Sequence, residues 1–434
     1  MFVTGRLALV LALGAPPVVL LSASGVPAWA VVGGWVALSA LALVVDVVVA
    51  ADPRAVTIER RIPGRVLRDD PVSTQVLVRN VGARRLHGLL RDAWQPTSGA
   101  PGARAPLDVP PGERRAIEVP LRPRRRGELR SDFVVVRASG PLGLGGRQAV
   151  LAAPGALRVL PPFTARRHLP SRLARLRELD GNTSVQVRGQ GTEFDSLREY
   201  VRGDDVRSID WRATARAGTT MLRTWRPERD RHVVIVIDTG RTAAARVGDG
   251  IRLDAAMESA LLLAALAARA GDHVHLVMFD RVVRARVTRR DGAALLPAMV
   301  DAMAPVEAQL IDTDWDAALA EVRALTSRPS LIVLLTAQDA VDSARGFLAA
   351  LPAVTARAHV LVGAANGDDE EQERERRTAE DVYREAARER GLRDAARVAD
   401  AVRRAGGEAL SASPENLPPA LADRYLALKA AGRL

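Results

Sequence analysis

The sequence predicts a mixed α/β protein that contains a transmembrane helical hairpin, a small β-sandwich and a doubly wound sheet. Three observations support this fold class: two apolar stretches open the chain, short alternating runs follow them, and the second half alternates apolar runs with helical patterns. At 434 residues the chain is longer than a single hydrophobic core usually supports. We place the domain boundaries to give a hairpin, a sandwich, a charged linking segment and an α/β domain: 1–51, 52–162, 163–231 and 232–434.

The composition limits the function. The chain carries 62 Lys+Arg against 51 Asp+Glu, and Lys429 is its one lysine. This usage is typical of a GC-rich coding bias, so the formal charge of +11 does not by itself indicate nucleic-acid binding. The chain has no cysteine, which excludes disulfides, thiolate metal sites and thiol nucleophiles.

The two apolar stretches, residues 7–24 and 26–45, are each close to the roughly 20 residues that an α-helix needs to cross a bilayer. Arginines follow the second stretch, whereas the connection around Gly25 is uncharged. The positive-inside rule therefore puts both ends of the hairpin in the cytoplasm. We expect a protein of the cell membrane with two helices in the lipid bilayer and the bulk of the chain cytoplasmic.

Two details of the hairpin leave alternatives open. Ala28-Trp29-Ala30 fits a small-x-small cleavage site, so a cleaved signal peptide is the alternative for the first stretch. Asp46 lies near the inner end of the second stretch. We interpret it as an anchor that snorkels to the headgroups, with an intramembrane functional acid as the alternative.

From about Ala55 to Leu160, short runs with period-two alternation are separated by turn signals such as Pro110-Pro111-Gly112. This pattern predicts a small antiparallel sandwich. The basic run from Arg122 to Arg126 lies between two predicted strands. We interpret it as a solvated turn, with contact to anionic lipids as the alternative.

The second half contains four apolar runs separated by helical patterns, at residues 232–238, 273–280, 330–337 and 358–365. Such an alternation predicts a parallel sheet that is covered on both faces. Residues 281–288 are typical of an edge strand.

Ligands of such sheets bind beyond the carboxyl ends of the strands. Three polar segments are expected to meet there: residues 238–242, 312–314 and 336–339. Their carboxylate and hydroxyl oxygens are ligands that suit a hard divalent ion such as Mg²⁺.

The segment Asp238-Thr239-Gly240-Arg241-Thr242 resembles the Asp-x-Ser-x-Ser motif of von Willebrand factor A-type domains. The preceding GTEFDSLREYVRGDDVRSIDWRATAR is similar to the signature of the domain of unknown function 58 family. The resemblance extends over the whole chain and implies a von Willebrand factor A-like domain in a bacterial membrane-anchored protein. It also implies a partner, since members are commonly encoded beside a MoxR-type AAA+ ATPase.

Two positions depart from the metal-site pattern of A-type domains. Gly240 replaces the first serine, and Ala337 stands where the third loop usually offers an aspartate. Asp238, Thr242 and Thr313 remain as candidate ligands of a degenerate site. We expect no cofactor and a pairing of Asp238 with an arginine such as Arg241, with bound Mg²⁺ as the alternative.

The segment from Gly189 to Asp238 is dense in acidic, basic and aromatic residues. Its charges nearly balance, and phosphate binding requires an excess of positive charge, so no nucleic-acid partner is expected. We expect a network that clamps the sandwich and the A-type domain in one orientation. Its proposed members are Arg198, Tyr200, Asp204, Arg207, Asp210, Trp211 and Arg216.

The sequence contains no convincing catalytic constellation. His273 and His275 share one strand face without an indicated carboxylate, so we interpret them as core or edge histidines. No loop matches the phosphate-binding glycine patterns. We therefore expect a scaffold or adaptor that is not an enzyme and that works with a MoxR-type AAA+ ATPase. The alternative is an accessory or regulatory subunit of a cell-envelope or polysaccharide assembly enzyme.

Overall fold

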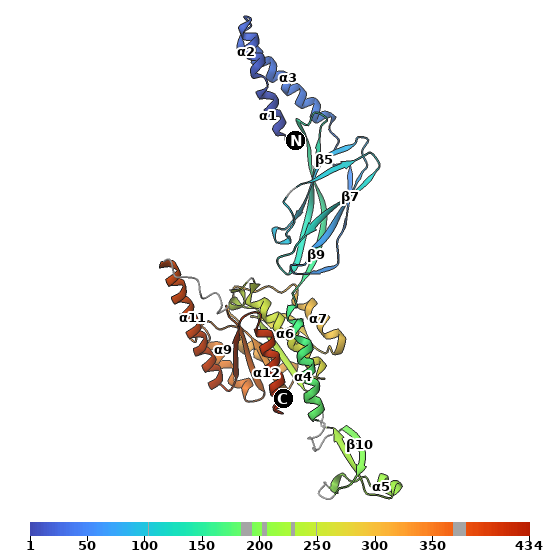
Figure 1. Ribbon diagram of the computed structural model, residues 1–434, viewed down its shortest axis with the longest axis vertical. Coiled ribbons are helices and arrows are strands. Elements are labelled where there is room, and N and C mark those ends of the chain that lie inside the picture. The colour runs from blue at the N-terminus through green and yellow to red at the C-terminus, as the bar shows by residue number, and fades with distance from the viewer. Residues whose placement is uncertain (103, 184–192, 202–205, 227–230, 249, 368–378) are drawn as a thin grey trace. The chain divides into compact units, whose positions relative to one another are not determined.

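The computed structural model describes residues 1–102, 104–183, 193–201, 206–226, 231–248, 250–367 and 379–434. The chain divides into two compact units, Met1–Leu160 and Pro161–Leu434 (Figure 1). The structure contains α-helices and several β-sheets, and apolar helices lie near the start of the chain. The predicted mixed α/β class is therefore confirmed.

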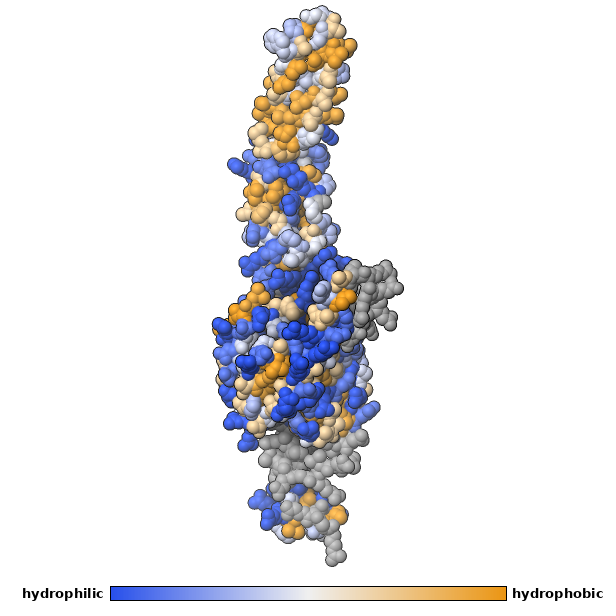
Figure 2. All heavy atoms as spheres, turned by 90° about the vertical axis from the view of Figure 1, so that its left-hand side faces the viewer, coloured by the Kyte–Doolittle hydropathy of each residue, from blue (hydrophilic) through white to orange (hydrophobic). Residues whose placement is uncertain are grey.

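The first unit begins with β1 (Phe2–Val3), α1 (Gly5–Ala12), α2 (Ala15–Ala23) and α3 (Ala28–Val49). Two helical spans, 5–23 and 28–49, are long and apolar enough to cross a membrane, which supports membrane anchoring. Figure 2 shows the apolar side chains that gather over these helices in orange.

The two spans pack closely against each other. Trp35 Nε1 donates a hydrogen bond of 2.9 Å to the carbonyl of Val10. A Cβ on Gly14 would lie 2.4 Å from the Trp35 ring, so only glycine allows this approach.

The strands of the first unit form two sheets that share one core. The order is β2-β4-β7 in one sheet and β1-β9-β8-β5-β6 in the other, where β3 pairs with β9. Alternate side chains of both sheets, such as Val76 and Val136, are fully buried in the common cluster. The bounds are β2 (Val56–Arg61), β3 (Arg65–Leu67), β4 (Val72–Asn80), β5 (Leu86–Trp94), β6 (Ala105–Val109), β7 (Arg114–Leu121), β8 (Gly127–Ser139) and β9 (Gly145–Leu160).

Asp46 joins α3 to the second of these sheets. Its carboxylate is fully buried and accepts the backbone N–H groups of Leu142, Leu144 and Gly145 at 2.7, 2.8 and 2.9 Å. These donors belong to the β8–β9 turn and replace the water that the charge loses on burial. The interpretation of Asp46 as a snorkelling anchor is therefore wrong, because its carboxylate is turned into the protein.

Asp46→Ala should destabilise the first unit. The substitution leaves three N–H groups without an acceptor, and each of the two buried ones, those of Leu144 and Gly145, costs about 1–3 kcal/mol. We expect a clear fall in the melting temperature of the detergent-solubilised chain. Asp52→Ala is the matched control, because Asp52 is exposed and its carboxylate accepts the N–H of Arg54 at a turn. Equal melting temperatures of the two variants would contradict this role of Asp46.

The second unit contains a six-stranded sheet in the order β16-β15-β12-β17-β18-β19. Neighbours from β15 to β19 pair in parallel, and β16 pairs antiparallel at the edge, as expected for residues 281–288. The strands are β12 (His232–Asp238), β15 (His273–Phe279), β16 (Val283–Val287), β17 (Pro329–Leu335), β18 (His359–Ala365) and β19 (Glu408–Ala412).

Helices cover both faces of this sheet, with α6 and α12 on one side and α9 and α11 on the other (Figure 1). Along β12, Val233, Ile235 and Ile237 pack into one core cluster, and Val234 and Val236 pack into the opposite one. Burial on both faces explains why this strand is a continuous apolar run. The main helices are α4 (Leu169–Thr183), α6 (Arg252–Arg269), α7 (Leu295–Met303), α8 (Trp315–Leu325), α9 (Arg345–Ala350), α10 (Pro352–Thr355), α11 (Ala379–Arg404) and α12 (Leu417–Ala430).

Candidate functional site

Asp238 ends β12 at the carboxyl edge of the sheet and is 3% exposed. Its Oδ1 accepts the N–H of Gly240 at 2.8 Å and the hydroxyl of Thr313 at 2.5 Å. Its Oδ2 accepts the hydroxyls of Thr336 and Thr242 at 2.6 and 3.2 Å. The expected meeting of residues from all three polar segments is therefore confirmed, and it is centred on one carboxylate.

Thr336 is not among the ligands expected from the sequence, although it makes one of the shortest contacts of the site. It follows β17 directly, and β17 lies beside β12 in parallel register, which brings its hydroxyl to Asp238. Gln338 Nε2 donates to the Thr336 hydroxyl at 2.9 Å and so orients it. The position of a hydroxyl immediately after a parallel strand is the sequence signal that identifies this residue.

The glycine at position 240 has a steric explanation. A Cβ built there would lie 2.3 Å from Thr313 Oγ1 and 2.9 Å from the carbonyl of Ile311. The Thr313 side chain thus occupies the space that a serine at position 240 would need. Replacing the serine of the metal-site pattern by glycine lets Thr313 reach Asp238 directly.

Arg241 does not pair with Asp238, so that expectation is wrong. Its guanidinium lies 3.1 Å from Asp312 Oδ1, and both of these side chains are largely exposed. The Asp238 carboxylate already accepts four hydrogen bonds from an amide and three hydroxyls in a buried position. Bringing a guanidinium there would add the cost of desolvating a second charge.

A second buried carboxylate, Asp280, lies directly beyond the adjacent strand β15. It accepts the hydroxyl of Thr239 at 3.0 Å, Arg284 Nε at 2.6 Å and the N–H of Arg281 at 2.6 Å. Burial alone would raise the pKa of Asp280, but the hydrogen bonds from Arg284 and the backbone outweigh it and hold this pKa below its ordinary value. Thr239 therefore ties the loop after β12 to the end of β15.

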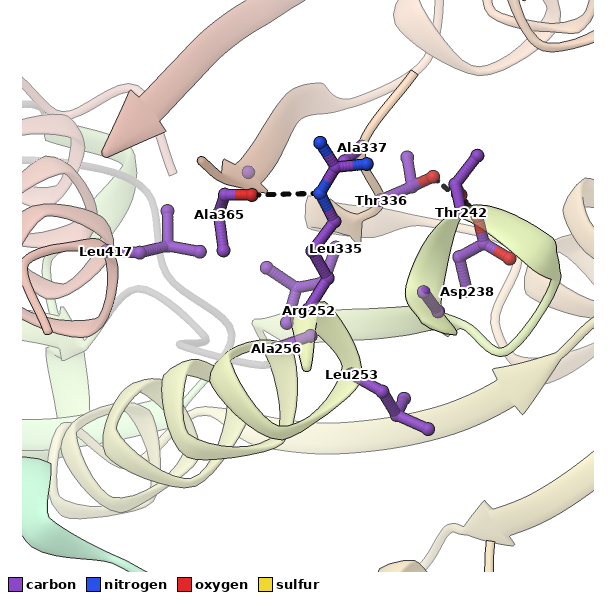
Figure 3. A pocket seen from close by; sticks show the side chains of 12 residues that line it. Asp238, Thr242, Arg252, Leu253, Ala256, Leu335, Thr336, Ala337, Ala365 and Leu417 are labelled. Atoms are coloured by element: carbon purple, nitrogen blue, oxygen red, sulfur yellow. Dashed lines mark hydrogen bonds between the residues drawn. The ribbon is translucent and has the colours of Figure 1, made fainter. Parts of the chain in front are cut away.

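The donor set around Asp238 does not fit a hard divalent cation. The adjoining pocket has a volume of about 10 Å³, room for about one water, and its lining includes Arg252 (Figure 3). Arg252 binds Asp339 at 2.6 Å, so the next acid of the third loop is also engaged. One carboxylate beside a guanidinium offers little to an ion that prefers about six oxygens. Among the described residues, no group of three or more acids or histidines is placed to hold a metal ion.

Gly240→Ala should destabilise the second unit. The added methyl would displace Thr313 and remove its hydroxyl from Asp238, so we expect a lower melting temperature. Gly346→Ala is the control, because a Cβ at position 346 of α9 meets nothing within 4 Å. An unchanged melting temperature of Gly240→Ala would contradict the steric role of Gly240.

Three histidines cluster at the opposite, amino edge of the sheet. The rings of His273 and His275 each stack on His232 with centroids 5.3 Å apart, and His232 Nδ1 lies 3.0 Å from His275 Nε2. Asp291 Oδ1 lies 3.1 Å from His273 Nδ1. The sequence did not indicate this carboxylate, although His275 is a buried histidine, in keeping with the interpretation of core or edge histidines. The acid belongs to a segment after the edge strand, where strand periodicity gives no sign of it.

The stability of the second unit should depend on His275 below neutral pH. Burial, followed by the charges of His232 and His273, lowers the pKa of His275. In the unfolded chain His275 has a pKa of about 6.5, so below that pH it binds more protons there than in the folded chain. The stability that the neutral His275 contributes is therefore full above about pH 6.5 and is lost as the pH falls. We expect His275→Gln to reduce the fall in melting temperature between pH 7 and pH 5. His87→Gln is the control, since His87 is exposed, and an unchanged pH dependence in His275→Gln would contradict the prediction.

The described part of the signature segment forms a hairpin of β10 (Glu193–Glu199) and β11 (Met221–Arg226), with the short helix α5 (Trp211–Ala217) between them. Asp210 caps α5 by accepting the N–H groups of Arg212 and Ala213, and it pairs with Arg223 at 2.7 Å. These contacts, the Ala213 hydrogen bond first, lower the pKa of Asp210. Its ion-pair partner is thus a residue outside the expected network.

Two other members of the expected network make hydrogen bonds that involve the backbone. Arg198 donates to the carbonyl of Glu199, and the N–H of Tyr200 donates to the carbonyl of Thr220. The remaining members with exposed side chains are Arg207, Trp211 and Arg216. Asp204 lies outside the described residues, so the clamp between the two units stays a prediction.

Comparisons with known proteins identify one family. Residues 196–374 match the family model described as "Protein of unknown function DUF58". No curated protein matches the chain.

Two solved structures resemble about a quarter of the chain. One is the CARDB domain of a Pyrococcus furiosus protein in complex with di-metal ions, 14% identical over 26% of this chain and 91% of that chain, with a TM-score of 0.19. Another is the human complex of zinc 2-glycoprotein and prolactin inducible protein, 14% identical over 24% and 92%, with a TM-score of 0.20. At these TM-scores the likeness says nothing about function. The family match, in contrast, agrees with the signature segment, because residues 196–374 are similar to the DUF58 family model.

Proposed function

We propose that this protein is a membrane-anchored scaffold or adaptor, not an enzyme, and that its α/β domain binds protein partners. The main support is the state of Asp238 at the edge of the sheet. All four hydrogen bonds of its carboxylate come from the protein itself, and the adjoining pocket has room for about one water. A substrate or a metal ion would have to displace these contacts, whereas a protein partner can bind the surface around them.

We propose that the α/β domain is von Willebrand factor A-like. Support comes from the parallel order of β15, β12, β17 and β18 and from the place of Asp238 at the end of β12, where such domains carry their motif. The same site in this chain works as an internal hydrogen-bonded junction and needs no cofactor. Its function is then to fix the loops that form the partner-binding edge.

The partner that we propose is an AAA+ ATPase of the MoxR type. The resemblance of the signature segment supports this choice, because members of the family that it resembles are commonly encoded beside such an ATPase. In this arrangement the ATPase supplies energy, and the present chain localises the complex to the membrane. The cytoplasmic orientation that the positive-inside rule predicts is required for this meeting.

The signature hairpin offers a candidate contact surface. Trp211 is 70% exposed at the start of α5, and the nearby Val206 is 62% exposed. Asp210 caps the helix, so the indole is presented from an ordered element. Exposed tryptophans on ordered elements are frequent anchors of protein interfaces.

Affinity purification of the detergent-solubilised full chain tests the proposal. We expect an AAA+ ATPase to co-purify in the presence of nucleotide, and Trp211→Ala to reduce its recovery without changing the melting temperature. Tyr383→Ala is the matched control, because Tyr383 is an exposed aromatic residue of α11, 77% exposed. Failure to recover an ATPase with or without nucleotide would count against the proposal. Recovery of an envelope-assembly enzyme in its place would favour the accessory-subunit alternative.

A further inference from the structure

Two arginines of the first unit hold the carbonyl groups that end α3. Arg84 Nη1 donates to the carbonyls of Val48 and Val49, both at 2.9 Å, and Arg147 Nε donates to that of Val47 at 3.0 Å. The last carbonyls of a helix have no partner within the helix. These contacts therefore fix two guanidinium groups at the carboxyl end of a membrane-spanning helix.

The length of α3 sets the depth of these groups. Its 22 residues span about 33 Å at about 1.5 Å per residue, close to the roughly 30 Å of the hydrocarbon core. The last carbonyls then lie at the level of the lipid headgroups. Arg6, in the first turn of α1, is at the same end of the hairpin, because its Nη1 covers Gly143 in the turn that binds Asp46.

Acids do not neutralise these arginines. Within the described part of the chain, Arg6, Arg84 and Arg147 form no ion pair with a carboxylate. Arg85, which follows Arg84 in the sequence, does form an ion pair, with Asp108 at 2.5 Å. Positive charge is thus left at the membrane surface at these three positions.

The remaining donors suit a phosphate. The carbonyl contacts use Nη1 of Arg84 and Nε of Arg147, which leaves Nη2 and further N–H groups on each guanidinium. A guanidinium binds phosphate oxygens with two parallel N–H groups, and anionic lipids concentrate phosphate at this depth. We propose that Arg6, Arg84 and Arg147 bind the headgroup phosphate of an anionic phospholipid. This site is independent of the protein partner proposed above.

Native mass spectrometry of the full chain in detergent tests this site. The chain is offered phosphatidylglycerol or phosphatidylcholine, and we expect it to retain phosphatidylglycerol preferentially. Arg6→Gln, Arg84→Gln and Arg147→Gln should each reduce that preference by roughly fivefold, the effect of one arginine near an anionic surface. Arg85→Gln is the control and should leave the preference unchanged, since Arg85 is paired with Asp108.

Two further measurements distinguish lipid binding from the binding of free phosphate and from helix capping. Inorganic phosphate should not compete with phosphatidylglycerol, and if it does, the site binds free phosphate and the proposal is wrong. Arg84 and Arg147 also cap α3, so their lysine variants, which keep the charge, are compared with the glutamine variants. Retained preference in Arg84→Lys and Arg147→Lys supports headgroup binding. Equal retention of the two lipids by the unmodified chain, or a preference that survives all three glutamine substitutions together, overturns it.

Discussion

The carboxylate of Asp238 is the common acceptor for the loops at the carboxyl edge of the sheet in the second unit. The loop that follows β12, the loop before α8 and the loop after β17 each give it a hydroxyl. A buried carboxylate is costly unless its oxygens are hydrogen-bonded, so each of these loops is held where its hydroxyl can reach. Gly240 belongs to the same constraint, because its missing side chain leaves the space for Thr313. Neutral donors, and not arginines, therefore hold the loops at this edge of the sheet in place.

Asp46 in the first unit is stabilised by the same means. Backbone N–H groups surround it, just as hydroxyls and an amide surround Asp238. Neutral donors stabilise a buried charge without requiring a second ion to lose its water. The arginines around the end of α3 donate to carbonyls of the helix, and these contacts do not neutralise their positive charge. The end of α3 therefore carries two kinds of charged group. The Asp46 carboxylate is buried and binds the β8–β9 turn, and the arginines donate to the helix carbonyls.

The parts of the structure that follow local patterns could be predicted from the sequence. The apolar run 232–238 had to be a strand buried on both faces, and the polar segments after such strands had to meet at one edge. The individual contacts could not be predicted, because they depend on distant residues. Asp46 finds its donors about one hundred positions later, and Asp291 reaches His273 from beyond an edge strand. Thr336 follows a predicted strand, which marks it as a candidate, and the register of β17 beside β12 brings its hydroxyl to Asp238.

The contact between Asp46 and the β8–β9 turn also has a consequence for biosynthesis. The acid and its donors are separated by 96 to 99 positions. At a translation rate of about 5–20 residues per second, the helix emerges roughly 5–20 seconds before its partners exist. During this interval the carboxylate has to remain hydrated, which holds the end of α3 in the headgroup region. The carboxylate becomes buried only when the β8–β9 turn has formed, so folding of the sandwich fixes the end of α3 in place.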